Sequence, residues 1–309
     1  MAVIRIGTAS WTDPSLIKCR RYYPPGCNSA EARLRFYASQ FPLVEVDSSY
    51  YVLPSERNSR LWIERTPADF LFNIKAFRVF TGHRTALQAL PADLRAACSN
   101  GRNAKDGGRD AIYYRDLPRE IRAELWARFS HAIGPLQQAG KLGSVLLQFA
   151  PWVVPGPRVF DHIRECRERL ARFEVAVEFR HRRWQQPDSR ESAVQLLREL
   201  KICHVAVDEP QGFEFSVRPH TAVTGRYALV RFHGRNRATW LKPGLASSAE
   251  RFDYYYTEAE LAEWLPRIEF MRSRASEVHL LFNTNNQDQG PVNARLLYNL
   301  LGEGLKEGS

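Results

Sequence analysis

Cysteine is scarce in this chain, and its pattern argues against a disulfide framework. The five cysteines are scattered and odd in number, with no Cys-x-x-Cys pair and no zinc-ligand spacing. Cys19 and Cys27 share one predicted loop, where they could pair or bind a metal. Cysteines of a cytosolic protein are usually reduced, so we expect Cys19 and Cys27 to be free thiols without a functional role.

Long apolar runs are also absent. No run approaches the length of about 18 apolar residues that a membrane-spanning helix needs. The first residues, Met1–Gly7, lead directly into a predicted strand and contain neither the apolar core nor the cleavage site of a signal peptide. We therefore expect a cytoplasmic protein with no membrane partner.

Lysine is rare, although the chain is strongly basic. Lysine and arginine together number 44, only 7 of them lysine and 37 arginine, and the net charge is +10. Arginine binds phosphate in a bidentate manner that lysine cannot match. A basic surface favours anionic partners, either small molecules or nucleic acid. A genome-wide preference for arginine codons explains the excess equally well.

Several common site motifs are missing. The sequence has no G-x-x-x-x-G-K-[ST] loop and no G-x-G-x-x-G fingerprint, so nothing predicts a nucleotide cofactor. It also lacks the G-x-S-x-G turn that presents a nucleophilic serine in many hydrolases.

What the chain does contain is a series of eight short apolar runs that turn polar near their C-terminal ends. Helical patterns separate most of them, and eight such units predict a closed (β/α)₈ barrel of the TIM type, in a single domain over residues 1–309. Reactive groups in such barrels lie at the C-terminal ends of the strands. The eight runs are Ile4–Trp11, Leu43–Tyr51, Phe70–Phe77, Ser144–Phe149, Glu174–Arg180, Cys203–Pro210, Tyr227–Gly234 and Val278–Thr284.

The connections between these strands are mostly helical. Helices are predicted at Ser29–Gln40, Pro54–Arg65, Pro118–Ala139, Arg158–Arg172, Ser189–Leu200, Thr257–Arg274 and Val292–Leu305. Gln211–Arg226, after the sixth strand, has no helical period and predicts an irregular crossover. Arg78–Gly143 forms a long insertion between the third and fourth strands. Its polar, Gly-rich part, Ser99–Asp110, is either a mobile lid or a surface insertion, and we favour the insertion.

Polar residues alternate with apolar ones along several strands. Residues two apart share a face of a strand, and unpaired charges are not tolerated against the surrounding helices. We therefore expect the polar face of each strand to line the barrel lumen and its mouth. This set comprises Glu45, Asp47, Lys75, Glu178, Arg180, Asp208, Arg231 and His233, with Asn73, Gln148 and Asn283 beside them.

We interpret this cluster as a binding or catalytic site. A self-satisfied network of salt bridges is the alternative, but buried ion pairs seldom add stability over apolar packing. The predicted catalytic residues are Glu178, Asp208 and His233. The predicted substrate-binding residues are Trp11, Asp47, Lys75, Arg180, Trp184, Arg231, Arg235, Trp240 and Asn283.

Aromatic and metal-ligating residues refine this interpretation. Four tryptophans, at positions 11, 152, 184 and 240, lie at or after strand ends beside arginines and predict a rim on which sugar rings or bases stack. Glu178, Asp208 and His233 could also hold a divalent metal ion. The neighbouring cations compete for those carboxylates, so a metal is not favoured.

These motifs together resemble those of the YecE-like family, known as domain of unknown function 72. The resemblance covers nearly the whole chain and implies a single TIM-like barrel without an established reaction. Departures are small and include Asp47, where the family more often has Asn. The matching segments are GTASW (Gly7–Trp11), YYPPG (Tyr22–Gly26), Phe41–Ser55, Trp62–Lys75, TGH (Thr81–His83), VEFRHRRW (Val177–Trp184), VD (Val207–Asp208), VRFHGR (Val230–Arg235), Phe252–Trp264 and Phe282–Leu297.

Three functions remain open on the sequence alone. The first is an enzyme, a hydrolase or isomerase, that acts on a phosphorylated, sugar-containing or nucleotide-containing substrate by acid/base chemistry. The second is a non-catalytic protein that binds nucleic acid or nucleotides through the basic, aromatic rim. The third, a scaffold with a vestigial site, fits the dense interior charges less well.

Overall fold

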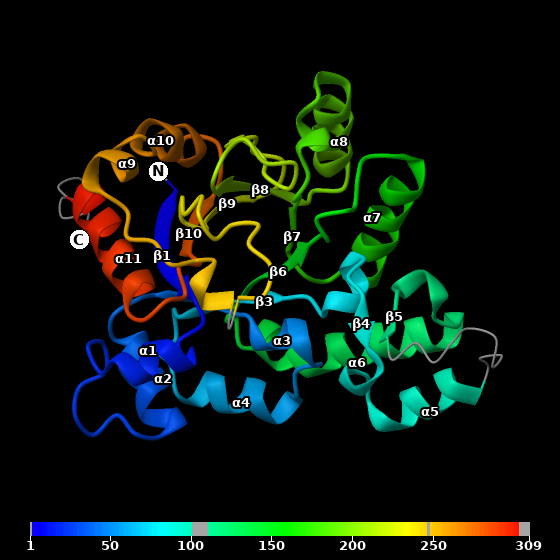
Figure 1. The fold of residues 1–309 in the computed structure, drawn as a ribbon. Helices are drawn as coiled ribbons and strands as arrows, with labels where there is room; N and C mark the ends of the chain where they lie inside the picture. The colour runs from blue at the N-terminus through cyan, green and yellow to red at the C-terminus, as the bar shows by residue number, and fades with distance from the viewer. Residues whose placement is uncertain (1, 101–110, 246–247, 303–309) are drawn as a thin grey trace.

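Eight parallel strands close into a barrel at the centre of the computed structural model, which describes residues 2–100, 111–245 and 248–302 (Figure 1). Neighbours around the ring follow the order β1, β2, β3, β6, β7, β8, β9, β10, so the predicted (β/α)₈ barrel is confirmed. The barrel strands are β1 (Val3–Ala9), β2 (Leu43–Val46), β3 (Leu71–Lys75), β6 (Leu142–Gln148), β7 (Val175–Glu178), β8 (Cys203–Asp208), β9 (Tyr227–Phe232) and β10 (Glu277–Phe282).

The lumen of the barrel is divided into an apolar lower layer and a polar upper layer. Leu43, Leu146, Leu229 and Leu281 are buried together in the lower layer, with Ala176 among them. Each is followed two residues later by a polar residue of the same strand face, since side chains alternate along a strand. The polar upper layer therefore lies toward the carboxyl ends of the strands, where barrel enzymes carry their sites.

Helices surround the ring of strands (Figure 1). Several begin where the sequence predicts, because a serine side chain accepts a hydrogen bond from a free backbone N–H of the first turn: Ser29 caps α2 and Ser55 caps α4. The helices are α1 (Pro14–Cys19), α2 (Ala30–Ala38), α3 (Ser48–Tyr51), α4 (Glu56–Glu64), α5 (Ala92–Asn100), α6 (Arg119–Gln138), α7 (Pro157–Arg169), α8 (Pro187–Glu199), α9 (Glu258–Ala262), α10 (Leu265–Arg272) and α11 (Gln289–Gly302).

The prediction of one continuous helix over Thr257–Arg274 is wrong. The segment forms two helices, α9 and α10, which are separated at Glu263 and Trp264. Pro266 occupies the first turn of α10, where its missing N–H is tolerated, whereas in the middle of one long helix it would break a backbone hydrogen bond. The break leaves Trp264 between the two helices.

The two unusual connections match the prediction. Gln211–Arg226, between β8 and β9, contains no helix. The insertion between β3 and β6 holds the 3₁₀ helix η1 (Arg78–Thr81), α5, α6 and a small antiparallel pair, β4 (Thr85–Ala86) with β5 (Ala111–Ile112). Of the segment predicted as a lid or an insertion, residues 101–110 lie outside the described residues. None of the described helices is long and apolar enough to cross a membrane.

Candidate site at the mouth of the barrel

Arg231 lies at the centre of the polar upper layer. From β9 its Nε donates to Glu45 of β2 at 3.0 Å, and its Nη2 donates to the other oxygen of the same carboxylate. Its Nη1 donates to Glu178 of β7 at 2.6 Å. All three side chains are completely buried, so this ion triad joins three strands across the lumen and its charges compensate one another.

Glu178 accepts hydrogen bonds at both of its oxygens. Besides Arg231 at Oε2, its Oε1 accepts from Gln148 at 2.7 Å and from Arg180 and His233 at 3.0 Å each. Burial opposes the charged form, but the charge of Arg231 and the surrounding donors hold the pKa of Glu178 well below its usual range. The carboxylate is therefore anionic, and both of its oxygens are hydrogen-bonded.

His233 is fixed in one tautomer by its neighbours. The amide nitrogen of Asn283 lies 3.0 Å from Nδ1, and the oxygen of that amide accepts a hydrogen bond from Asn285. Nδ1 is thus an acceptor, and the proton is on Nε2, which donates to Glu178. Burial lowers the pKa of His233 to about 3, with the nearby charge of Arg180 acting in the same direction. We conclude that His233 is neutral at physiological pH.

Glu45 of β2 and Asp47, which follows this strand, form a second acidic pair. Burial raises the pKa of Glu45 to about 7, despite the charge of Arg231. Asp47, two residues further along the same face, lies 3.2 Å from Nζ of Lys75. Burial opposes its ionisation, but the charge of Lys75 lowers its pKa. Glu45 therefore takes up a proton more readily than Asp47, whose side chain keeps about a fifth of its surface exposed.

Three cations gather around Tyr50 and His83 at the mouth. Nζ of Lys75 lies 4.6 Å from the centre of the Tyr50 ring, and the guanidinium of Arg78 lies 5.1 Å from it. The His83 ring lies 5.2 Å from the Tyr50 ring. Burial lowers the pKa of His83 to about 3, helped by the charges of Lys75, Arg78 and Arg180. Those three cations therefore all contribute to the positive potential around His83.

Arg180 connects the buried triad to the mouth. Its Nη1 donates to Glu178, and its Nη2 lies 3.2 Å from Oε2 of Glu209. Its guanidinium lies over the Trp240 ring, 5.1 Å from the ring centre, in cation–π geometry. The Nε atoms of Arg180 and Arg78 are both buried and have no hydrogen-bond partner among the described residues.

Glu209 is a member of the site that the sequence analysis missed. It follows β8, is buried, and accepts a hydrogen bond from the backbone N–H of Val217 at Oε1. Oε2 has no hydrogen-bond partner within the described part of the chain. Burial raises the pKa of Glu209 to about 7, against the opposing charge of Arg180. A carboxyl group of this kind exchanges its proton near neutral pH.

The prediction that Asp208 converges on this cluster is wrong. The inner face of β8 carries Val205 and Val207, which belong to the inner apolar layer, whereas Asp208 points to the surrounding helices. There it accepts from Nε and Nη2 of Arg235, from Tyr256 at 2.7 Å and from the Trp264 indole at 2.7 Å. Residues of later connections thus neutralise the charge of Asp208 outside the lumen.

The predicted aromatic rim is also largely incorrect. Trp11 packs against Trp62 and Phe72, and Trp184 stacks on Phe179 at 3.8 Å, so both rings belong to the packing between barrel and helices. Trp240 is buried beneath Arg180. Of the four tryptophans only Trp152 is exposed, at 52%. The buried rings have no free face on which a base or sugar could stack.

The structure therefore divides the predicted site residues into three groups. The mouth and upper layer bring together Asp47, Lys75, Glu178, Arg180, Arg231, His233, Trp240 and Asn283. Asp208 and Arg235 form a separate pair near α9, and Trp11 and Trp184 lie in the core. Tyr50, Arg78, His83 and Glu209 also lie at the site and are not among the residues predicted from the sequence. The TGH segment is the one signal that pointed to His83.

No group of three or more histidine, cysteine or acidic side chains in the described ranges is arranged to hold a metal ion. Glu178 and His233 do lie together, but Asp208, the third predicted ligand, is elsewhere. The carboxylate of Glu178 is bound by two arginines, which would repel a cation.

The architecture and the polar mouth define an α/β barrel protein of the TIM-like class. The family described as "Protein of unknown function DUF72" matches residues 5–308, so the chain belongs to this family and the predicted resemblance is confirmed.

Related proteins agree with this assignment. The chain is 29% identical over 302 residues to the UPF0759 protein YunF of Bacillus subtilis (strain 168), covering 97% of this chain and 95% of that protein. A DUF72 family protein from Enterococcus faecalis V583 has the same fold, with a TM-score of 0.75 at 25% identity over 97% of this chain and 96% of that one. Another, from Thermotoga maritima MSB8, gives a TM-score of 0.74 at 25% identity over 97% and 99%.

Proposed function

We propose that this protein is an enzyme that binds an anionic substrate at the mouth of the barrel. The observation that carries the proposal is the pair of buried, unpartnered Nε–H groups of Arg78 and Arg180. A buried donor without an acceptor costs about 1–3 kcal/mol, which an anionic oxygen would recover. Guanidinium groups bind phosphate and carboxylate oxygens through short, charge-assisted hydrogen bonds. Lys75 adds a third positive charge beside Tyr50.

Glu209 is the proposed proton-transfer group. Its Oε2 faces the same guanidinium of Arg180 that contacts the anion, and it has a free lone pair. With a pKa near 7 the carboxyl group can accept or give up a proton at physiological pH. In hydrolysis, Glu209 takes a proton from water as the water oxygen bonds to the substrate. The bond to the leaving group then breaks, and the leaving group departs with its electron pair.

Glu178 and His233 have a positioning role in this proposal, in place of the proton transfer expected from the sequence. Three donors share Oε1 of Glu178, Arg231 donates to Oε2, and both ring nitrogens of His233 are engaged. Glu178 holds Nη1 of Arg180 in place, and His233 helps to orient Glu178 by donating to the same carboxylate oxygen. The arrangement supports hydrolysis or isomerisation of a phosphorylated or sugar-containing substrate.

Turnover of chromogenic p-nitrophenyl phosphates, phosphodiesters and glycosides tests this proposal. We expect the wild-type protein to hydrolyse at least one class, and Glu209→Gln to lower kcat by about 100-fold or more, as is usual when a general acid or base is removed. Glu191→Gln, at an exposed position of α8, is the matched control and should retain wild-type kcat. Equal kcat for wild type and Glu209→Gln would contradict the role of Glu209.

A further inference from the structure

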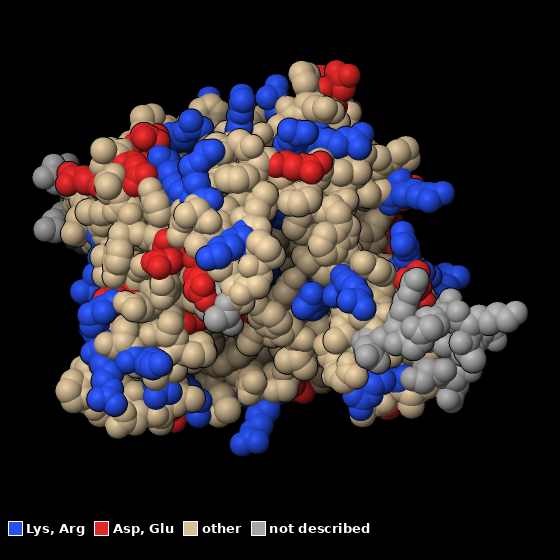
Figure 2. Space-filling view, in the orientation of Figure 1, with Lys and Arg blue, Asp and Glu red and all other residues tan. Residues whose placement is uncertain are grey.

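A second basic site lies on the flank of the barrel, apart from the mouth. A hollow of about 590 Å³ is formed by the 3₁₀ helix η5 (Arg182–Gln185), the start of α8 and the segment 214–220. Its four arginines are Arg182, Arg183, Arg190 and Arg218, and all four are exposed. Figure 2 shows basic side chains gathered over the region of α8, with an acidic group beside them.

The charges of these arginines are not compensated. Within the described ranges, none of the four guanidinium groups forms an ion pair, unlike Arg60, Arg128 or Arg235 elsewhere on the surface. Glu214 is the one acidic residue that lines the hollow, and it lies 3.4 Å from His181. The site therefore keeps a strong positive charge.

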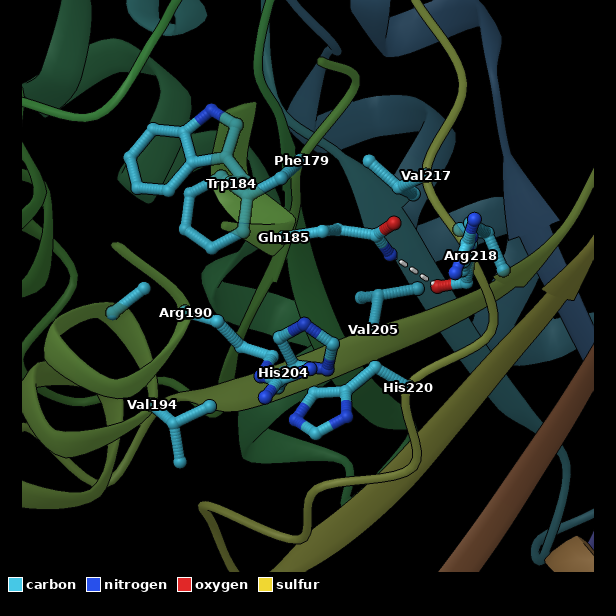
Figure 3. Close-up of a pocket in the computed structure, with 12 residues that line it drawn as sticks. Phe179, Trp184, Gln185, Arg190, Val194, His204, Val205, Val217, Arg218 and His220 are labelled. Carbon is cyan, nitrogen blue, oxygen red and sulfur yellow. Dashed lines mark hydrogen bonds between the residues drawn. The ribbon is translucent and has the colours of Figure 1, made fainter. Parts of the chain in front are cut away.

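A smaller recess of about 20 Å³, large enough for a single water, adjoins the hollow and shares Gln185, Arg190 and Arg218 with it. Figure 3 shows Gln185 bonded to the backbone oxygen of Arg218, with His204 and His220 on the opposite wall. Nδ1 of His204 is buried and lacks a hydrogen-bond partner among the described residues. Burial lowers the pKa of His204 to about 3. Burial, together with the charges of Arg190 and Arg198, also lowers the pKa of His220. Both rings therefore favour the neutral form, and the site's charge comes from its arginines.

We propose that this arginine groove, defined by Arg182, Arg183, Arg190 and Arg218, binds the phosphate backbone of a nucleic acid. The four cations belong to three separate segments, which suits successive phosphates of an extended strand better than one compact anion. The arginines are exposed, whereas a small-ligand site buries most of its ligand. Backbone N–H of Arg182 donates to the backbone oxygen of Glu214, which fixes two of the segments to each other. The site is independent of the chemistry at the mouth.

Fluorescence anisotropy with a fluorescein-labelled single-stranded oligodeoxynucleotide tests the groove. We expect the double variant Arg183→Gln/Arg218→Gln to bind about tenfold more weakly, and the slope of log K against log salt to fall by about 1.4, since each lost phosphate contact accounts for about 0.7. The matched control is Arg119→Gln/Arg158→Gln, which removes two exposed arginines at the starts of α6 and α7. It should bind as the wild type does.

Three results would overturn the assignment. The first is equal weakening by the groove and control variants, which would show only a dependence on net charge. The second is loss of oligonucleotide binding by Lys75→Met, which would place the strand at the mouth. The third is a groove variant that loses binding of inorganic triphosphate but keeps the oligonucleotide, which would identify a small polyphosphate as the ligand.

Discussion

Arg180 and Glu209 form an ion pair at the mouth of the barrel, with 3.2 Å between Nη2 and Oε2, although they follow different strands, β7 and β8, and only Arg180 is predicted from the sequence as a site residue. The carboxyl group is buried, and its second oxygen accepts from the backbone N–H of Val217. Arg180 is in turn held by Glu178 and lies over Trp240. The pair therefore joins the inner network of the barrel to the loop after β8.

The buried carboxyl of Glu209 predicts a pH-dependent contribution to stability. Its pKa rises from 4.5 to about 7 on folding, so between these values the folded state binds more protons than the unfolded state. Stability from this group is complete below the unfolded pKa and is lost as the pH rises through about 7. Glu209→Gln should remove this loss and gain up to about 3 kcal/mol relative to wild type at high pH.

Urea unfolding of wild type and Glu209→Gln measures this effect, at about pH 5 and about pH 8. The difference in unfolding free energy between the two proteins should grow toward the higher pH, while contributions from Glu45 cancel in the comparison. Glu191→Gln should show no such trend. A difference that stays constant with pH would mean that Glu209 ionises normally.

The ion triad around Arg231 predicts a large effect on stability. Arg231→Met leaves Glu45 and Glu178 buried without their shared cation, and breaking a buried pair in this way costs about 3–5 kcal/mol. Arg60→Met, which removes an exposed ion pair with Glu56 on α4, should have a much smaller effect on the unfolding free energy. If Arg231→Met and Arg60→Met lost similar amounts of unfolding free energy, the triad would not make a special contribution to stability.

The position of Asp208 predicts a structural role that is separable from ligand binding. Asp208→Asn keeps the size of the side chain but loses the charge that binds Arg235, and the amide cannot accept from all of Arg235, Tyr256 and Trp264. We expect a loss of about 2–4 kcal/mol in unfolding free energy, since the hydrogen bonds involve a buried charge. Pyrophosphate binding at the mouth, measured below the unfolding transition, should be unchanged. If Asp208→Asn had wild-type stability but bound pyrophosphate more weakly, Asp208 would belong to the ligand-binding site.

The surroundings of His233 predict a neutral imidazole with its proton on Nε2. Its pKa is lowered to about 3, so its ¹⁵N chemical shifts should stay constant between about pH 5 and about pH 8, where an ordinary histidine titrates. Two-dimensional ¹H–¹⁵N spectra of histidine-labelled protein, with His233→Gln for assignment, measure both the charge and the tautomer. Titration in this range, or a protonated Nδ1, would contradict the hydrogen-bond arrangement.

The fold was predictable from the sequence because its eight strands alternate with helices and carry clear polarity patterns. In β2, β7 and β9 the two faces differ sharply, so Glu45, Glu178 and Arg231 were correctly placed in the lumen. The sequence also contained the signal for the break between α9 and α10, since Pro266 falls within the predicted helix.

The polarity pattern of β8 led to the wrong prediction that Asp208 points into the lumen. Residues far along the chain neutralise its charge on the outward face of the strand. Asp208 is satisfied by Arg235, Tyr256 and Trp264, which follow in later connections, and nothing in the strand itself shows this. The same limit explains why Trp184 was wrongly predicted to lie on the rim. Its stacking on Phe179 depends on how the chain turns after β7. Glu209 was missed for a related reason, since its place on the inner face follows only once Val205 and Val207 are known to point inward.

Isothermal titration calorimetry with pyrophosphate tests the central claim, that the mouth of the barrel is an anion site. We expect the wild-type protein to bind pyrophosphate, and Lys75→Met to bind it at least about tenfold more weakly, which corresponds to about 1.4 kcal/mol. Lys18→Met, which removes one exposed charge on α1, should bind with wild-type affinity. Equal affinities for Lys75→Met and Lys18→Met, or no binding by the wild type, would contradict the claim.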